Sequence, residues 1–173
     1  MLALIVSVAL VTACNRESPN TAASSTNMVV FREAKVSVDV GSGWKRVYNG
    51  PGLPNCTPML LSSNGVVGAM LFAGSDTSIQ EAVTAAHEMF LNRTNSLKNS
   101  WHQIPFTSGS GVRGQHMSSI ETKTKDGNKT LRQTHDFVFQ KKDGRLVSVT
   151  YMGPVGDNAE AIQQKIQRSL KLE

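Results

Sequence analysis

Apolar and polar residues alternate along the early part of the chain. Val36, Val38 and Val40 fall on one side of an extended segment and polar side chains fall on the other, which is the period of a half-buried strand. Two further apolar stretches, residues 58–61 and 66–73, lie on either side of an Asn-Gly pair, a strong signal for a hairpin turn. The chain up to residue 73 therefore predicts three β-strands.

The hydrophobic period changes at Ser78, where a helix is expected to begin. Ser78 and Glu81 have the spacing of a capping box, in which each side chain binds the backbone N–H of the other residue. The apolar positions that follow fall on one stripe: Ile79, Val83, Ala86, Phe90 and Leu97. We expect an amphipathic helix of about 18 residues that ends near residues 95–99.

Four strand-like segments follow this helix, and the last three predict an antiparallel meander. The segments cover residues 101–106, 112–124, 129–140 and 145–152. An Asp-Gly pair stands at both junctions of the last three, which favours tight hairpins. We expect a two-residue first turn and a three-residue second turn with a glycine bulge.

These turns determine which residues face each other in the meander. The expected partners are Glu121 with Arg132, His116 with Phe137, Phe139 with Val147, and His135 with Tyr151. This register gathers four apolar side chains on one face of the sheet, which is the reason to prefer it. They are Phe137, Phe139, Val147 and Val149. The same register places His116 and His135 diagonally on one face of the first hairpin.

A second amphipathic helix closes the chain. We expect Asp157 to cap it, with Glu160 at its third position and Ile162, Ile166 and Leu170 along its apolar side. Two helices of this size cannot cover both faces of a parallel sheet, but they can cover an antiparallel one. The sequence therefore predicts the α+β class, with a single antiparallel sheet of about six strands packed against two helices.

The order of these elements resembles a known fold. A strand that ends in Gly-Trp (Gly43-Trp44), a mid-chain helix, an antiparallel meander and a closing helix together resemble the PsbP-like fold. The resemblance covers residues 31–173. A small Ran-binding protein and several bacterial envelope lipoproteins share this fold, so the resemblance implies a binding or assembly module rather than an enzyme. It implies no particular functional residue.

The N-terminus carries a targeting signal. Residues 1–11 are almost wholly apolar, and a run of about 11 residues is too short to span a bilayer but matches the hydrophobic region of a signal peptide. Residues 10–14, Leu-Val-Thr-Ala-Cys, resemble a bacterial lipobox, which implies cleavage before Cys14 and acylation of its thiol. The alternatives are a plain secretory peptide cleaved near Ala13 and a short buried strand.

The chain is therefore expected to have three parts. Residues 1–13 are a lipoprotein signal peptide, residues 14–30 are a flexible tether rich in small polar residues, and residues 31–173 are a single α+β domain. Once Cys14 is acylated, Cys56 has no partner within the chain. We expect a buried thiol at Cys56, with an intermolecular disulfide as the alternative.

The charge of the chain is positive but dispersed. Its 18 Lys and Arg residues exceed its 13 Asp and Glu residues and give a formal net charge of +5. These basic residues form no long run and do not alternate with aromatic residues, so we expect no nucleic-acid partner. The excess of positive charge favours attraction to anionic surfaces such as phospholipid head groups, cell-wall polymers or an acidic protein.

The sequence contains no pattern typical of a catalytic site. It has no Gly-x-Ser-x-Gly elbow and its carboxylates are scattered, so we expect neither an enzymatic activity nor a cofactor. None of its four histidines has the spacing of metal ligands on one element. His116 and His135 are weak metal candidates that need a third ligand from elsewhere. The alternative is a pair of hydrogen-bonded histidines at the edge of the core.

Residues 48–58 are rich in proline and glycine and predict a stiff, exposed loop. Loops carry binding functions more often than strands do. The candidate partner-binding residues in and beside this loop are Tyr48, Leu53, Pro54 and Met59. A plain connector is the alternative.

These patterns favour a lipid-anchored module on the periplasmic face of a bacterial cell envelope that binds another envelope or secreted protein. An inhibitor or immunity protein against a secreted toxin or cell-wall hydrolase is one version, and an accessory subunit of an envelope complex is another. Asn15 after the cysteine favours the outer membrane, and a homodimer is left open. The alternative function is a small-ligand or metal-binding envelope lipoprotein, which predicts a cavity beside the meander.

Overall fold

A seven-stranded antiparallel sheet forms the centre of the protein. The computed structural model describes residues 28–32, 34–48, 58–71 and 77–173. The strands of the main sheet, in spatial order, are β3 (Lys45–Tyr48), β4 (Pro58–Ser62), β5 (Gly65–Leu71), β9 (Leu146–Pro154), β8 (Asn128–Gln140), β7 (Arg113–Lys125) and β6 (His102–Thr107). All neighbouring strands in this sheet are antiparallel.

A second, small sheet packs beside the first. It consists of β1 (Met28–Phe31), β2 (Val36–Asp39) and β10 (Lys171–Leu172), with β2 in the middle. The α+β class is confirmed, but the main sheet has more strands than the expected six and the first predicted strand belongs to the small sheet. Gly41 and Gly43, with φ of +82° and +84°, turn the chain out of β2 before β3 begins.

The first strand also begins earlier than the sequence suggested. β1 starts at Met28, whereas the tether was expected to run to residue 30. Its pairing with β2 from Met28 opposite Asp39 to Phe31 opposite Val36 draws these residues into the domain. The predicted signal peptide, Cys14 and most of the tether lie outside the described residues.

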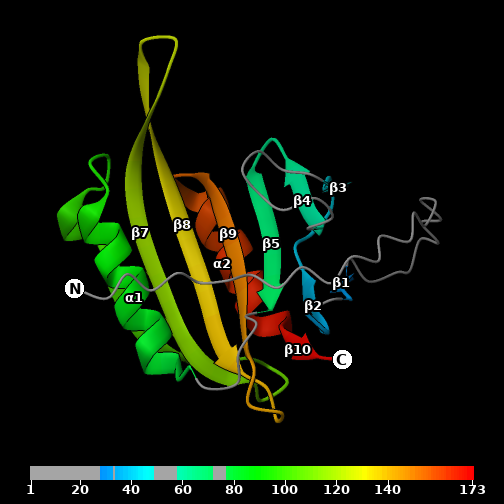
Figure 1. The fold of residues 1–173 in the computed structure, drawn as a ribbon. Coiled ribbons are helices and arrows are strands. Elements are labelled where there is room, and N and C mark those ends of the chain that lie inside the picture. Colours follow the sequence, from blue (N-terminus) through cyan, green and yellow to red (C-terminus); the bar gives the residue numbers. More distant parts are fainter. Residues whose placement is uncertain (1–27, 33, 49–57, 72–76) are drawn as a thin grey trace.

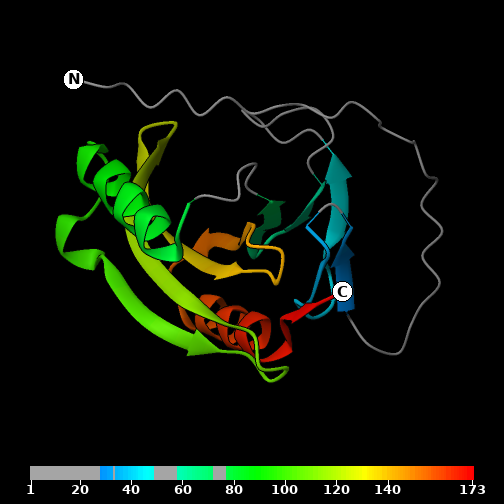
Figure 2. The same cartoon turned by 60° about the horizontal axis from the view of Figure 1, so that its bottom comes forward.

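The two helices lie on opposite faces of the main sheet (Figures 1 and 2). α1 (Ile79–Asn92) covers β7 and β8, where its Val83 packs against Met117 and Val138. α2 (Asp157–Ser169) covers the other face together with the small sheet. Among the described residues, neither helix has the length and apolarity required to cross a membrane.

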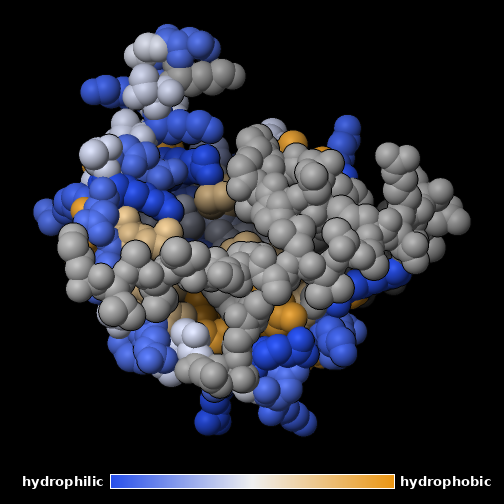
Figure 3. Space-filling model, viewed as in Figure 1, coloured by the Kyte–Doolittle hydropathy of each residue, from blue (hydrophilic) through white to orange (hydrophobic). Residues whose placement is uncertain are grey.

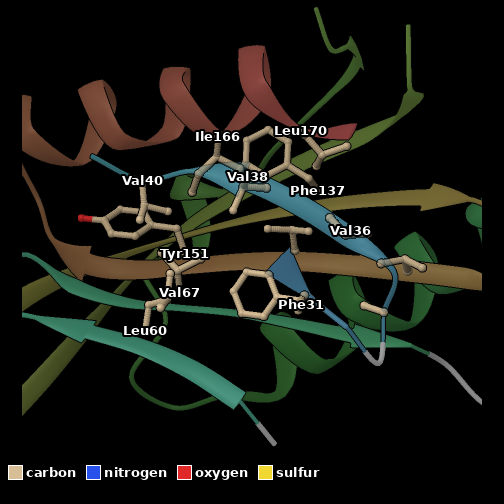
Figure 4. Packing of buried hydrophobic residues seen from close by; sticks show 14 of the residues in the cluster. Phe31, Val36, Val38, Val40, Leu60, Val67, Phe137, Tyr151, Ile166 and Leu170 are labelled. Carbon is tan, nitrogen blue, oxygen red and sulfur yellow. The ribbon is translucent and has the colours of Figure 1, made fainter. Parts of the chain in front are cut away.

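The main core lies between the sheet, α2 and the small sheet (Figure 4). Its residues come from all three layers and include Phe31, Val36, Val38, Leu60, Val67, Phe137, Phe139, Val147, Val149, Tyr151, Ile162, Ile166 and Leu170. Trp44, the aromatic residue of the Gly-Trp pair, packs on this core and makes a T-shaped contact with the Tyr151 ring at a centroid distance of 6.5 Å.

The predicted registers of the meander are confirmed. Glu121 faces Arg132 and His116 faces Phe137 in β7–β8, while Phe139 faces Val147 and His135 faces Tyr151 in β8–β9. The first turn has two residues, Asp126 and Gly127, both with positive φ as a type I′ turn requires. The second turn closes with a hydrogen bond from the Lys141 N–H to the Arg145 carbonyl.

α1 ends earlier than predicted. The capping box of Ser78 and Glu81 is present, but the helix stops at Asn92 and Arg93 already has an extended backbone. The Lys98 ammonium donates hydrogen bonds to the carbonyls of Phe90, Leu91 and Arg93 at the helix end, where backbone carbonyls run out of helical partners. Leu97, expected on the apolar stripe, is therefore exposed.

α2 begins without the predicted side-chain cap. Its N-cap is Gly156, and Asp157 is the first helical residue rather than the cap. Asp157 and Glu160 both lie in the first turn, where a negative charge interacts favourably with the helix dipole. The expected apolar side is correct, since Ile162, Ile166 and Leu170 are all buried.

Candidate functional site

The structure brings together the two histidines that the sequence singled out. His116 lies on β7 and His135 lies diagonally opposite on β8, and their side chains are 7% and 5% exposed. Nε2 of His116 is 3.0 Å from Nδ1 of His135. His116 stacks on Phe137 at a centroid distance of 4.6 Å, and His135 lies beside Tyr151 at 6.0 Å.

The geometry of this pair fits a shared hydrogen bond rather than a metal site. The ring planes differ by 9° and the centroids are 5.2 Å apart, so the facing nitrogens point at each other instead of converging on a common point. Nε2 of His135 is also 2.6 Å from the Gln133 side-chain nitrogen. Within the described residues, no group of three His, Cys, Asp or Glu side chains is placed to hold a metal ion.

One pattern of protons satisfies the whole cluster. If Gln133 donates to Nε2 of His135, the Nδ1–H of His135 donates to Nε2 of His116, and both imidazoles are neutral. Burial favours this neutral state and lowers the pKa of each histidine from 6.5 to about 4. The positive charge that His116 would carry adds to the lowering at His135.

A second buried polar cluster lies on the opposite face of the sheet. Asp136 faces Met117 at the edge of the α1 core, and the Thr150 hydroxyl donates a hydrogen bond to its carboxylate. The Ser148 hydroxyl lies 3.3 Å from that of Thr150. Burial raises the pKa of Asp136, and the hydrogen bond from Thr150 opposes the rise.

The predicted partner-binding loop falls mostly outside the described residues, as do Leu53, Pro54 and Cys56. Tyr48 ends β3 opposite Pro58. Met59 lies in β4 with 9% exposure, and its side chain packs near Gly68 of β5. The structure therefore buries Met59 instead of presenting it to a partner.

The most prominent surface feature is a hairpin arm that the sequence analysis did not anticipate. β7 and β8 continue beyond their neighbours, because the pairing with β9 ends at Arg132 and the pairing with β6 ends at Ser118. Residues 123–130, which we call the arm, pair only with each other and project from the sheet (Figure 1). The arm contains three lysines and one aspartate.

The base of the arm is held by charged side chains. Glu121 lies 3.8 Å from Arg93 and 3.7 Å from Arg132, measured from carboxylate oxygen to guanidinium nitrogen. The Asn95 amide donates to the carbonyl of Thr122 at 3.3 Å, and Ser96 forms a β-bridge with Glu121. These contacts fix the direction in which the arm leaves the domain.

A groove of about 300 Å³ lies at the foot of the arm, between the arm and the β4–β5 hairpin. We call it the arm groove. Its apolar side consists of Val66, Met152 and Pro154, and its charged rim carries Lys123 and Arg132. Leu131 also borders the groove, but it faces Thr122 and its side chain lies on the opposite face of the hairpin. Arg132 also donates to the thioether sulfur of Met152 at 2.8 Å. Figure 3 shows the hydrophilic arm and apolar surface lower on the same face.

Lys123 and Arg132 reach the same groove because of the strand register. Glu121 faces Arg132 and Lys123 faces Thr130. Because residues two apart in a strand point to the same face, these four side chains lie on one face of the hairpin. Lys129 faces Thr124 and points to the opposite face. The sequence contains one indication of the arm: the two segments beside the first Asp-Gly turn are longer than the third segment of the meander.

Comparison with known proteins agrees with the predicted fold. No protein-family description and no curated protein matches this sequence. Among solved structures, LpqN of Mycobacterium tuberculosis, described as involved in cell envelope biogenesis, is similar with a TM-score of 0.55 and 11% identity. That match covers 84% of this chain and 88% of LpqN.

A second similar structure is the cyanobacterial PsbP protein, CyanoP, of Synechocystis sp. PCC 6803. Its TM-score is 0.57 at 9% identity, over 91% of this chain and 99% of CyanoP. This chain has the PsbP-like fold. A protein of Bacteroides thetaiotaomicron VPI-5482 matches with a TM-score of 0.50 and 13% identity, over 87% of this chain and 49% of that one.

The PsbP-like fold was predicted from Gly43-Trp44 and the order of the elements, and this prediction is confirmed. At these identities the likeness concerns the fold and identifies no functional residue of this chain. The PsbP-like scaffold supplies the sheet, and the arm projects from it (Figure 1).

Proposed function

We propose that the chain is a lipid-anchored module of the bacterial cell envelope that binds another envelope or secreted protein and catalyses no reaction. The observation that carries the proposal is the arm. A two-stranded ribbon without a third strand or a packed helix is marginally stable by itself, so the fold gains little from building it. A projecting element without a packing role is best explained by contact with a partner.

The charge of the arm indicates what kind of surface it meets. Three lysines within residues 123–130 outweigh Asp126, and no carboxylate in the described part of the chain forms an ion pair with Lys123 or Lys129. Exposed charges of one sign accelerate association with a surface of the opposite sign. The partner surface is therefore acidic, and binding should weaken as the salt concentration rises.

The N-terminus supports an envelope location for this contact. The lipobox-like residues 10–14 would place a diacylglycerol on Cys14, and the polar residues after it would let the domain stand away from the lipid. The similarity to LpqN agrees with such a location. An inhibitor of a secreted toxin or cell-wall hydrolase and an accessory subunit of an envelope complex both fit this arrangement.

Shortening the arm tests the proposal. Replacing residues 123–130 with Ser-Asn-Gly-Thr keeps a hydrogen-bonded pair in the places of residues 123 and 130 and closes it with a two-residue Asn-Gly turn. Because the described arm side chains are exposed, the free energy of unfolding should change by less than about 1 kcal/mol. The partner that co-purifies with the full chain from solubilised membranes should be lost.

A matched control removes the same net charge elsewhere. The arm carries three lysines and one aspartate, a net of +2, so the control changes the exposed Lys142 and Lys171 to serine. This variant should retain the partner. The proposal is wrong if the arm-shortened chain keeps every protein that the full chain binds, or if the full chain is recovered alone even after crosslinking.

A further inference from the structure

The arm groove has the properties of a ligand site in addition to those of a contact surface. It lies beside the meander, where the small-ligand alternative predicts a cavity. Its wall is apolar along Val66, Met152 and Pro154, and Pro154 is exposed. An exposed apolar wall beside fixed positive charge favours a ligand with an apolar body and an anionic end.

The charges at the rim favour an anion over a cation. Lys123 has no ion-pair partner among the described residues. Glu121, the acidic residue at the base of the arm, is already shared between Arg93 and Arg132. An anion placed between Lys123 and Arg132 would therefore meet two cations and no carboxylate that is not already paired.

The size of the groove sets the length of the apolar part. A water molecule takes up about 30 Å³ of liquid, so a groove of about 300 Å³ has room for a chain of roughly ten carbon atoms. A peptide would have to satisfy its own backbone N–H and C=O groups, and the apolar side of the groove offers them few partners. An acyl chain has no such requirement.

We propose that the arm groove binds a fatty acyl carboxylate of medium length. Its chain lies along Val66, Met152 and Pro154, and its carboxylate is bound by Lys123 and Arg132. This site goes beyond the protein contact, because it would exist even if the arm met no partner. For an envelope protein, such a ligand would be a free acyl chain released at the membrane surface.

Titration with decanoate, below the concentration at which it forms micelles, tests this site in the full chain. With methionine methyl groups labelled for NMR, the Met152 signal should shift and saturate. Met89, which is 59% exposed on α1, should not shift. Butyrate, which lacks the chain, and decyltrimethylammonium, which reverses the charge, should each bind at least about tenfold more weakly.

Two variants of the arm distinguish specific binding of decanoate in the arm groove from general electrostatic attraction to the lysines of the arm. Lys123→Glu should weaken decanoate binding at least tenfold, whereas Lys129→Glu, on the opposite face of the arm, should change it less than about twofold. Parallel shifts of Met152 and Met89, equal binding of the two ten-carbon probes, or equal effects of the two variants would overturn the inference. Because the probe is added to the chain alone, none of these results depends on the protein partner.

Discussion

Substituting Gly114 with alanine should lower the free energy of unfolding by about 3 kcal/mol or prevent folding. Gly114 lies in β7 between β6 and β8, where a Cβ atom would be 2.1 Å from the Val138 carbonyl oxygen. It would also be 2.9 Å from ring and side-chain carbons of Phe106 and Phe139. The carbonyl belongs to a neighbouring strand and cannot move without breaking the ladder. Urea denaturation of the purified chain measures the effect.

Gly68→Ala is the matched control, since Gly68 also lies within a strand of the main sheet. The nearest atom to its added Cβ would be Cγ of Met59 at 3.7 Å, which is ordinary van der Waals contact. Alanine loses less conformational freedom on folding, so this variant should be as stable as the parent or more stable by up to about 1 kcal/mol. Equal stability of the Gly114→Ala and Gly68→Ala variants would contradict the close packing of neighbouring strands around Gly114.

Lowering the pH from about 7.5 to 4.5 should remove roughly 2–4 kcal/mol of stability through His116 and His135. In the unfolded chain both residues take up protons near pH 6.5, whereas in the folded domain burial lowers the pKa of each to about 4. The unfolded state therefore binds more protons in this window, and stability falls as the pH falls through it. Screening by solvent keeps the loss below the value that two full shifts would give.

Single variants separate the two histidines from other titrating groups. Burial raises the pKa of Asp136, so its contribution has the opposite sign and is common to all variants. His116→Phe and His135→Phe should each remove about half of the histidine-dependent slope. Denaturation curves at several pH values measure this slope. Slopes in both variants that equal the slope of the parent chain would contradict the buried pair.

Local sequence signals were sufficient to predict the parts of the fold that depend on turns and on the alternation of apolar and polar residues. The Asp-Gly pairs determine the meander register, and that register alone places His116 near His135. Turn geometry determines pairing directly because the side-chain period in a strand is two residues. The capping box likewise located the start of α1 at Ser78.

Features that depend on distant contacts could not be predicted in the same way. α1 stops at Asn92, and the residues after it pair with distant β7: the Asn95 carbonyl accepts from the Thr122 N–H, and the Leu97 N–H donates to the Ile120 carbonyl. β10 has two residues and pairs with β2 across almost the whole chain, so it has no local signature. The arm exists because β6 and β9 end early, and the arm groove exists because the β4–β5 hairpin lies beside it.

Photo-crosslinking from the arm in intact cells tests the central claim most directly. A photoreactive amino acid replaces Thr124 in the arm of the full chain, and in a second variant it replaces Glu160, an exposed residue of α2. The account predicts a discrete protein adduct in the membrane fraction from position 124 and none from position 160. No adduct from position 124, or the same adducts from both positions, would contradict a binding module that acts through its arm.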